Sequence, residues 1–307
     1  MFPEFGSAPE VRDDLGIPEP AEGEVRVRVR AASVNGFDLA VAAGTVQGMM
    51  EHRFPVVLGK DFAGVIDAAG PGVAGYAAGD RVFGVVAKPF LGDGSFGEFV
   101  TVPVAVGLAK LPESVSFTDG AALGLAGTAA LDSVDAAALR PGHVALIAGA
   151  TGGVGGYAVQ LAAQAGAAVI ATAHTADGKD LVTRLGAVET VDYTGDVAAQ
   201  VLASHPDGVD AVIHLAGDPA ALLPALGDGG RLVSTLIMSA GQLPAASATV
   251  APVYANPAPD KLDRLAQDSA RQRISVSVEK VYPLTQAEQA FAHFSQGTRG
   301  KVVLSLG

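Results

Sequence analysis

The feature that most constrains the fold of this chain is a glycine-rich turn between an apolar strand and an apolar helix. The run Val144–Ala148 leads into Ala150-x-Gly152-x-x-Gly155, and a helix is predicted to begin there. A second apolar run follows at Val169–Ala173. Strand, tight turn, helix and second strand in this order predict a βαβ unit with a parallel sheet. One face of the helix carries apolar residues at helical spacing, namely Val154, Ala158, Leu161, Ala162 and Ala165.

The same turn has the pattern that binds the pyrophosphate of a dinucleotide, with alanine in place of the first glycine. Gly152 lets backbone N–H groups approach the anion, and Gly155 lets the helix pack close to the sheet. The helix N-terminus adds unpaired amides and a partial positive charge. A glycine-rich turn without a ligand is the alternative, and the strand–turn–helix context favours binding. The predicted contacts are Ala150, Gly152, Gly153, Val154 and Gly155.

The end of the second strand indicates which dinucleotide is bound. NAD-binding proteins usually place Asp or Glu there to hold the ribose 2′-hydroxyl. Here the run Ala171–Thr175 contains no acid, and the first one is Asp177. A missing carboxylate removes repulsion against a 2′-phosphate, so NADPH is favoured over NADH. His174, Lys179 and Tyr193 are within reach as phosphate partners, although Lys179 could equally be a solvated residue of a helical turn.

Three regions of the chain differ in pattern. Up to about residue 115 short runs alternate, as in Gly23–Asn35, where valines face one side and arginines the other, which predicts a half-buried strand. The middle alternates apolar strands with helices and predicts a parallel sheet buried on both faces. The predicted elements include strands at Val56–Leu58, Thr190–Asp192 and Asp210–Ala216, a helix near 219–226, and then helix Asp260–Arg271, strand Ile274–Val278, helix Thr285–Gln296 and strand Lys301–Leu306.

Composition excludes several functions. The net charge of −12 over 307 residues leaves no basic surplus for nucleic acid and disfavours an anionic membrane surface. There is no cysteine, hence no disulfide and no cysteine-ligated zinc. The charge-free run Val144–Ala173 is long enough to span a bilayer, but its six glycines and its change of period favour a buried strand–turn–helix–strand. The opening MFPEFGSAPEVRDD lacks an export signal, so we expect a soluble cytoplasmic protein.

The motifs resemble the medium-chain dehydrogenase/reductase superfamily, in particular its zinc-free quinone oxidoreductase branch. The resemblance implies an α/β fold in which a GroES-like, β-rich catalytic domain (residues 1–116 and 253–307) carries an inserted Rossmann domain (residues 117–252). The matching motifs, in order along the chain, are AASVNGFD, FPVVLGKDFAGVI, GDRVFG, GEFV, LPESVSF, GTAAL, GATGGVG and RGKVVL.

The resemblance also bears on metals and on proton transfer. Zinc-dependent relatives have Cys where this chain has Asn35 and a His-Glu pair where it has Lys60-Asp61, so no metal is expected. Many reductases of the branch carry a tyrosine shortly after the Asn-x-x-Asp motif, where this chain reads Leu39-Ala40-Val41. Lys60, Asp61 or water could supply the proton instead. The expected catalytic residues are Asn35, Lys60 and Asp61.

We therefore expect hydride transfer from NADPH to a quinone or an α,β-unsaturated carbonyl, which accepts hydride without help from a metal. The alternatives are a biosynthetic reductase of thioester or carrier-bound enoyl substrates, and a non-catalytic NADPH-binding protein like the related lens crystallin. The resemblance implies a homodimer. It places Asn35 and Thr128 at the nicotinamide ribose or ring; the adenosine phosphate would face His174, Thr175, Lys179 and Tyr193, and the nicotinamide side Ala216, Gly217 and Leu236.

Two further departures from the family pattern concern structure. His214 stands at the end of a core strand where relatives often have Asp, and a buried structural histidine is the favoured interpretation. The opening MFPEFG lacks part of the usual first strand, which would weaken one sheet edge.

Overall fold

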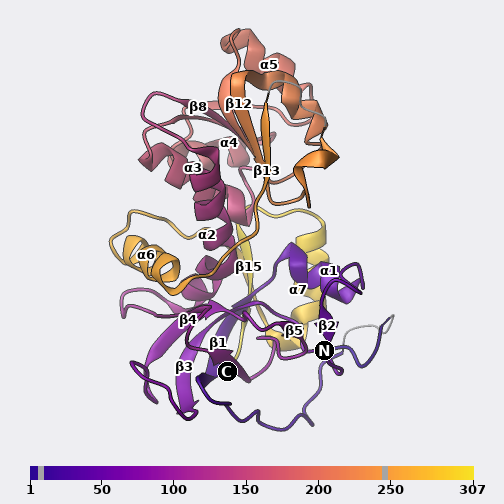
Figure 1. Cartoon of the computed structure of the whole chain (residues 1–307), viewed down its shortest axis with the longest axis vertical. Helices are drawn as coiled ribbons and strands as arrows, with labels where there is room; N and C mark the ends of the chain where they lie inside the picture. Colours follow the sequence, from indigo (N-terminus) through magenta and orange to yellow (C-terminus); the bar gives the residue numbers. More distant parts are fainter. Residues whose placement is uncertain (6–9, 244–247) are drawn as a thin grey trace. The chain divides into compact units, whose positions relative to one another are not determined.

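The computed structural model describes residues 1–5, 10–243 and 248–307. The chain forms two compact units: unit 1 combines Met1–Leu125 with Pro257–Gly307, and unit 2 is Ala126–Asn256 (Figure 1). Both ends of the chain thus belong to one unit, into which the middle is inserted. The long helix α2 (Phe117–Ala137) contains the first division. The domain boundaries at 116/117 and 252/253 stay predictions.

Unit 1 is built on a seven-stranded sheet in the order β14-β15-β1-β3-β4-β7, with β6 also paired to β1. Its strands are β1 (Glu24–Ser33), β3 (Asp61–Ala69), β4 (Arg81–Val85), β6 (Phe99–Pro103), β7 (Leu108–Lys110), β14 (Val278–Pro283) and β15 (Lys301–Ser305), and β2 (Glu51–His52) pairs separately with β5 (Phe90–Leu91). The helices of this unit are α1 (Gly36–Ala42), α6 (Pro259–Ala270), α7 (Ala287–Ser295) and the 3₁₀ turn η3 (Leu284–Gln286).

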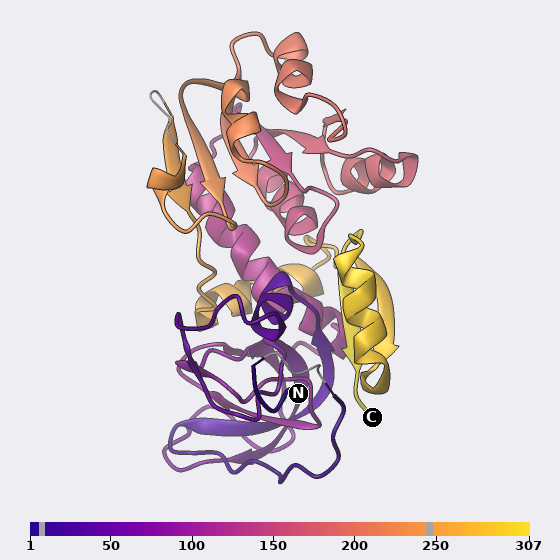
Figure 2. The ribbon, with the colours of Figure 1, turned by 90° about the vertical axis from the view of Figure 1, so that its right-hand side faces the viewer.

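The alternation of β1 explains its place in the sheet. Val25, Val27 and Val29 are buried in the core of unit 1, while Arg26 and Arg28 point outward and pair with Asp67 on β3. The C-terminal strand β15 is antiparallel to β1 and parallel to β14. Figure 2 shows the C-terminal residues, in yellow, within the same unit as the N-terminal strands. The last strand of the chain is therefore an interior strand of the first unit.

Unit 2 has a six-stranded, all-parallel sheet in the order β10-β9-β8-β11-β12-β13. Numbered from its first strand the order is 3-2-1-4-5-6, that of the dinucleotide-binding doubly wound fold, in which ligands bind beyond the carboxyl ends of the two strands where the order reverses, here β8 and β11. The strands are β8 (Val144–Ala148), β9 (Ala168–Thr172), β10 (Glu189–Val191), β11 (Val209–His214), β12 (Leu226–Ser234) and β13 (Thr249–Pro252), and the helices are α3 (Gly153–Gln164), α4 (Ala176–Arg184), α5 (Val197–Ser204) and the 3₁₀ turns η1 (Ala220–Ala225) and η2 (Ala240–Gln242).

Several predicted elements were wrong in type or position. The strand predicted at Val56–Leu58 is only an isolated bridge between Val56 and Phe2. In the described part of the opening, Phe2 makes this bridge and Met1 exchanges two hydrogen bonds with Glu10, while Gly6 lies outside the described residues. The strand predicted at Ile274–Val278 lies at β14 instead. The helix predicted near 219–226 is the 3₁₀ turn η1, which contains Pro224 and therefore lacks one backbone N–H donor.

The charge-free run Val144–Ala173 forms β8, α3 and β9 of the parallel sheet. In the described part of the chain, no helix combines the length and the apolar character needed to cross a membrane.

Candidate functional site

The glycine-rich turn of unit 2 joins β8 to α3 at the point where the strand order of the sheet reverses. Gly149 has φ +85°, a left-handed conformation that favours glycine, and its N–H donates to the Thr172 hydroxyl at 2.9 Å. A Cβ on Gly149 would lie 3.0 Å from that of Ala216, which follows β11. The loop after β8 and the loop after β11 therefore meet at the point where the strand order reverses.

Glycine stands at positions 155 and 152 for different structural reasons. A Cβ at Gly155 would lie 2.1 Å from the Gly149 carbonyl oxygen and 2.6 Å from the Ala150 Cα, so only glycine permits this approach of helix and loop. A Cβ at Gly152 would meet only the Gly149 carbonyl oxygen, at 3.4 Å. Gly152 is the N-cap of α3, and no side chain caps the helix there. The first-turn amides are thus presented without a side-chain acceptor, which fits the pyrophosphate of a dinucleotide.

The predicted adenosine-side residues lie beyond the end of β9. His174, Thr175 and Lys179 are exposed, and the Thr175 hydroxyl accepts the Gly178 N–H at 3.1 Å as the cap of α4. The hydroxyl oxygen of Thr175 therefore already has a structural partner. The ring of exposed Tyr193 lies 5.9 Å from that of His174, so the two side chains form one surface.

An acid that the sequence analysis missed stands beside this surface. Asp192 follows β10, and its carboxylate lies 2.9 Å from Nδ1 of His174. Hydrogen bonds from the Thr194 N–H, from His174 and from the Thr194 hydroxyl lower the pKa of Asp192 to about 2. The end of β9 thus lacks an acid, but the neighbouring strand β10 supplies one. The predicted parallel sheet could have indicated Asp192, because the carboxyl ends of neighbouring parallel strands, here β9 and β10, lie at the same edge.

The predicted nicotinamide-side residues of unit 2 are grouped around the end of β11. Ala216, Gly217 and Leu236 are exposed there, whereas Thr128 is fully buried in α2. His214 is buried: its Nδ1 pairs with the Ser234 hydroxyl at 2.8 Å and its Nε2 with the Gly217 carbonyl at 3.1 Å.

Burial lowers the pKa of His214 despite the raising effects of the Gly217 carbonyl and Asp218. Both ring nitrogens have partners, which supports the structural interpretation of this histidine.

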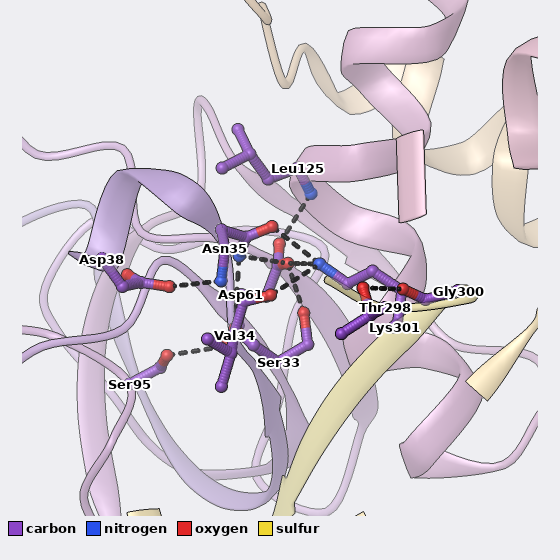
Figure 3. A network of polar contacts seen from close by, with 10 residues as sticks. All are labelled: Ser33, Val34, Asn35, Asp38, Asp61, Ser95, Leu125, Thr298, Gly300 and Lys301. Carbon is purple, nitrogen blue, oxygen red and sulfur yellow. Dashed lines mark hydrogen bonds and ion pairs between the residues drawn. The ribbon is translucent and has the colours of Figure 1, made fainter. Parts of the chain in front are cut away.

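In unit 1, Asp61 is the centre of a buried hydrogen-bond network (Figure 3). Its Oδ1 accepts the Leu125 N–H at 2.6 Å. Its Oδ2 accepts the Ser33 hydroxyl at 2.6 Å and the Asn35 amide at 2.9 Å, and lies 3.4 Å from the Lys301 ammonium. The side chain of Asp61 is fully buried among these partners.

Asn35 and Lys60 are the other predicted catalytic residues. Asn35, the N-cap of α1, is buried and donates from its backbone N–H to Asp38 at 2.8 Å. Lys60 is half-buried, donates to the Val86 carbonyl, and lies 5.5 Å from the centre of the Phe37 ring. Burial lowers the pKa of Lys60, with Asp38 and Asp61 opposing that effect. A lysine of this kind can release its proton closer to neutral pH than an exposed one.

Lys301 is the functional candidate that sequence reasoning missed. It opens β15 within the motif RGKVVL, and its side chain is 3 % exposed. A lysine at the start of an apolar strand is the signal that could have found it, since buried lysines are rare unless paired. Among the residues that the structure describes, no three His, Cys, Asp or Glu side chains are grouped so as to hold a metal ion.

Two family models match the chain. One, described as an alcohol dehydrogenase GroES-like domain, matches residues 21–113, and the other, described as a zinc-binding dehydrogenase, matches residues 185–304.

Individual relatives match over most of the chain. It is 30 % identical to a quinone oxidoreductase of Sus scrofa, covering 98 % of this chain and 95 % of that protein. It is 38 % identical to a mycocerosic acid synthase-like polyketide synthase of Mycolicibacterium smegmatis, over 70 % of this chain but only 10 % of that protein. The solved quinone oxidoreductase of Coxiella burnetii has a TM-score of 0.86 at 26 % identity, covering 95 % of this chain and 93 % of that one.

Proposed function

Because the chain belongs to the quinone oxidoreductase branch of the medium-chain dehydrogenase/reductase superfamily, we propose that it reduces quinones or α,β-unsaturated carbonyls with NADPH and without a metal ion. The protein is an oxidoreductase of a family that uses pyridine nucleotides. The observation that carries the proposal is the uncapped N-terminus of α3 at the switch point of the unit 2 sheet.

The loop between β8 and α3, together with the first turn of α3, would bind the pyrophosphate through backbone amides between Ala150 and Gly155. Ala216, Gly217 and Leu236 would border the nicotinamide, as would Asn35 and Thr128. When bound, the nicotinamide supplies the hydride. A conjugated acceptor already delocalises the negative charge that hydride brings, so orientation in a dry site is the main contribution of the protein.

Metal independence is supported by the partners of the residues that replace zinc ligands. The side-chain oxygens of Asn35 and Asp61 already accept hydrogen bonds within unit 1, including those from the ammonium of Lys301. Lys60 adds a second positive charge, which disfavours a cation. We propose Lys60 rather than the enclosed Asp61 as the residue that protonates the reduced substrate. Its lowered pKa favours proton release, and its side chain is the less buried of the two.

The preference for NADPH over NADH is supported by exposed His174 and Lys179 beyond β9. The anionic Asp192, whose carboxylate lies 2.9 Å from Nδ1 of His174, works against it. A homodimer is supported by β13, which ends the order of the described unit 2 sheet and so offers an edge for pairing. A cytoplasmic location stays a prediction.

The reaction is tested by following NADPH absorbance with the purified protein and a naphthoquinone, phenanthrenequinone or a simple enone. We expect turnover with at least one acceptor, a higher kcat/KM with NADPH than with NADH, and unchanged activity after dialysis against EDTA. Tight NADPH binding without turnover of any acceptor would instead identify a nucleotide-binding protein without catalysis. Loss of activity with EDTA would contradict the metal-free reaction.

The polyketide synthase match favours one second candidate, a reductase of enoyl thioesters. It is separated from the first by including an enoyl pantetheine thioester in the same assay. A kcat/KM for the thioester well above those for quinones and simple enones would favour the second candidate.

A further inference from the structure

The ammonium of Lys301 is enclosed by oxygen atoms of unit 1. It donates to Oδ1 of Asn35 at 2.7 Å and to the Val34 carbonyl at 3.2 Å, and it lies 3.4 Å from Oδ2 of Asp61 (Figure 3). A lysine ammonium has three N–H donors, so each has an acceptor here. Burial lowers the pKa of Lys301, and the acids Asp61 and Asp38 oppose that effect. Burying an ammonium group costs free energy of desolvation even when the group is paired. A lysine at this position therefore suggests a role other than stabilising the fold.

The amide of Asn35 is held from both sides. Its Nδ2 donates to the Ser33 carbonyl at 3.2 Å and to Asp61 at 2.9 Å, while its Oδ1 accepts from Lys301. A flipped amide would place Nδ2 against the ammonium and Oδ1 against the carboxylate, losing both charge-assisted hydrogen bonds. Because Nδ2 has used both of its N–H groups, a ligand contact by Asn35 must go through Oδ1, which can accept a second hydrogen bond.

We propose that Lys301 is a positioning residue for hydride transfer, whose ammonium fixes the orientation of the Asn35 amide and so makes Oδ1, not Nδ2, the atom that Asn35 can offer to the nicotinamide ribose. The role rests on the proposed function, since it requires Asn35 to contact the nicotinamide end of NADPH. Lys301 touches neither cofactor nor substrate in this role, and acts only through Asn35.

The test is a double-mutant cycle of Lys301→Met and Asn35→Ala, measured as kcat and as the NADPH dissociation constant. We expect Lys301→Met alone to lower kcat at least about tenfold and to weaken NADPH binding about threefold. In the Asn35→Ala background it should change either quantity by less than about twofold. The unfolding midpoint should fall in both backgrounds, because the carboxylate of Asp61 loses its ion pair either way.

The matched control is Lys280→Met, the same substitution at an exposed lysine of the neighbouring strand β14, which should leave kcat and NADPH affinity unchanged. If Lys301→Met does not fold, the same cycle is measured in an Asp61→Asn background, where Lys301→Met leaves no unpaired carboxylate at position 61. Additive effects in kcat and in the dissociation constant would overturn the role of Lys301. Absent turnover by the wild type would overturn the proposed function instead, and the cycle in NADPH affinity would still decide on Lys301.

Discussion

Asp38 shows how a single buried group can make stability depend on pH. Its carboxylate accepts the Asn35 N–H at 2.8 Å and is 1 % exposed. Burial raises its pKa to about 7, with Asp61 adding to the rise, while the Asn35 hydrogen bond, Lys301 and Lys60 oppose it. The folded state therefore holds a proton that the unfolded chain has released between about pH 4 and pH 7. Stability from this group falls as pH rises through that window.

Asp38→Asn removes the charge and keeps an oxygen that can accept the Asn35 N–H. We expect it to be more stable than the wild type above pH 7, by about 2–4 kcal/mol, with the advantage shrinking toward pH 5. Urea unfolding at several pH values measures the difference. Asp38→Ala, which also removes the acceptor, should be less stable than Asp38→Asn at every pH. A pH-independent difference between Asp38→Asn and the wild type would refute the raised pKa.

At the scale of elements, the packing of α3 against its own preceding loop sets the geometry of the nucleotide site. The helix can approach the loop only because position 155 carries no Cβ. The next residue, Gly156, is also buried, but a Cβ there would meet only Leu185 Cδ1, at 3.4 Å. Two adjacent glycines of one helix therefore have opposite tolerance for a methyl group.

Gly155→Ala is expected to displace the start of α3 and to weaken NADPH binding at least about tenfold, with a lower Tm. Gly156→Ala is the matched variant: it should bind NADPH like the wild type and could gain up to about 1 kcal/mol from helix propensity. Calorimetry and thermal unfolding measure both. Equal affinities for the two variants would show that the loop geometry does not govern nucleotide binding.

At the scale of the whole molecule, unit 1 depends on residues from the two ends of the sequence. β15 lies between β1 and β14, and Val302, Val303 and Leu304 are fully buried. Burying three such side chains contributes about 5–9 kcal/mol, which is comparable with the total stability of a typical protein. The first unit is thus incomplete until the last strand is in place.

A chain that stops after Gly300 lacks β15 and Lys301, and we expect it not to form unit 1. Loss of cooperative unfolding by circular dichroism, or recovery only in the insoluble fraction, would measure this. A chain that stops after Leu306 lacks only the exposed Gly307 and should behave like the full sequence. A cooperative wild-type-like transition for the shorter chain would contradict the interior role of β15.

The sequence alone determined the parallel sheet, the glycine-rich turn and the family, because these depend on residues close together along the chain. Periodicity identified β1, β8 and α3, and glycine spacing identified the turn. The same local reasoning placed a strand at Val56–Leu58, where apolar residues pack without a sheet partner other than the bridge to Phe2.

Only the tertiary structure decided which distant side chains meet. Asp192 reaches His174 because two parallel strands end at one edge, and Lys301 reaches Asn35 and Asp61 because the last strand pairs with the first. Hydrogen bonds and ion pairs act over a few ångströms in space, irrespective of the 266 positions that separate Lys301 from Asn35. Burial and pKa shifts depend on all neighbours of a group at once, so they could be determined only from the tertiary structure.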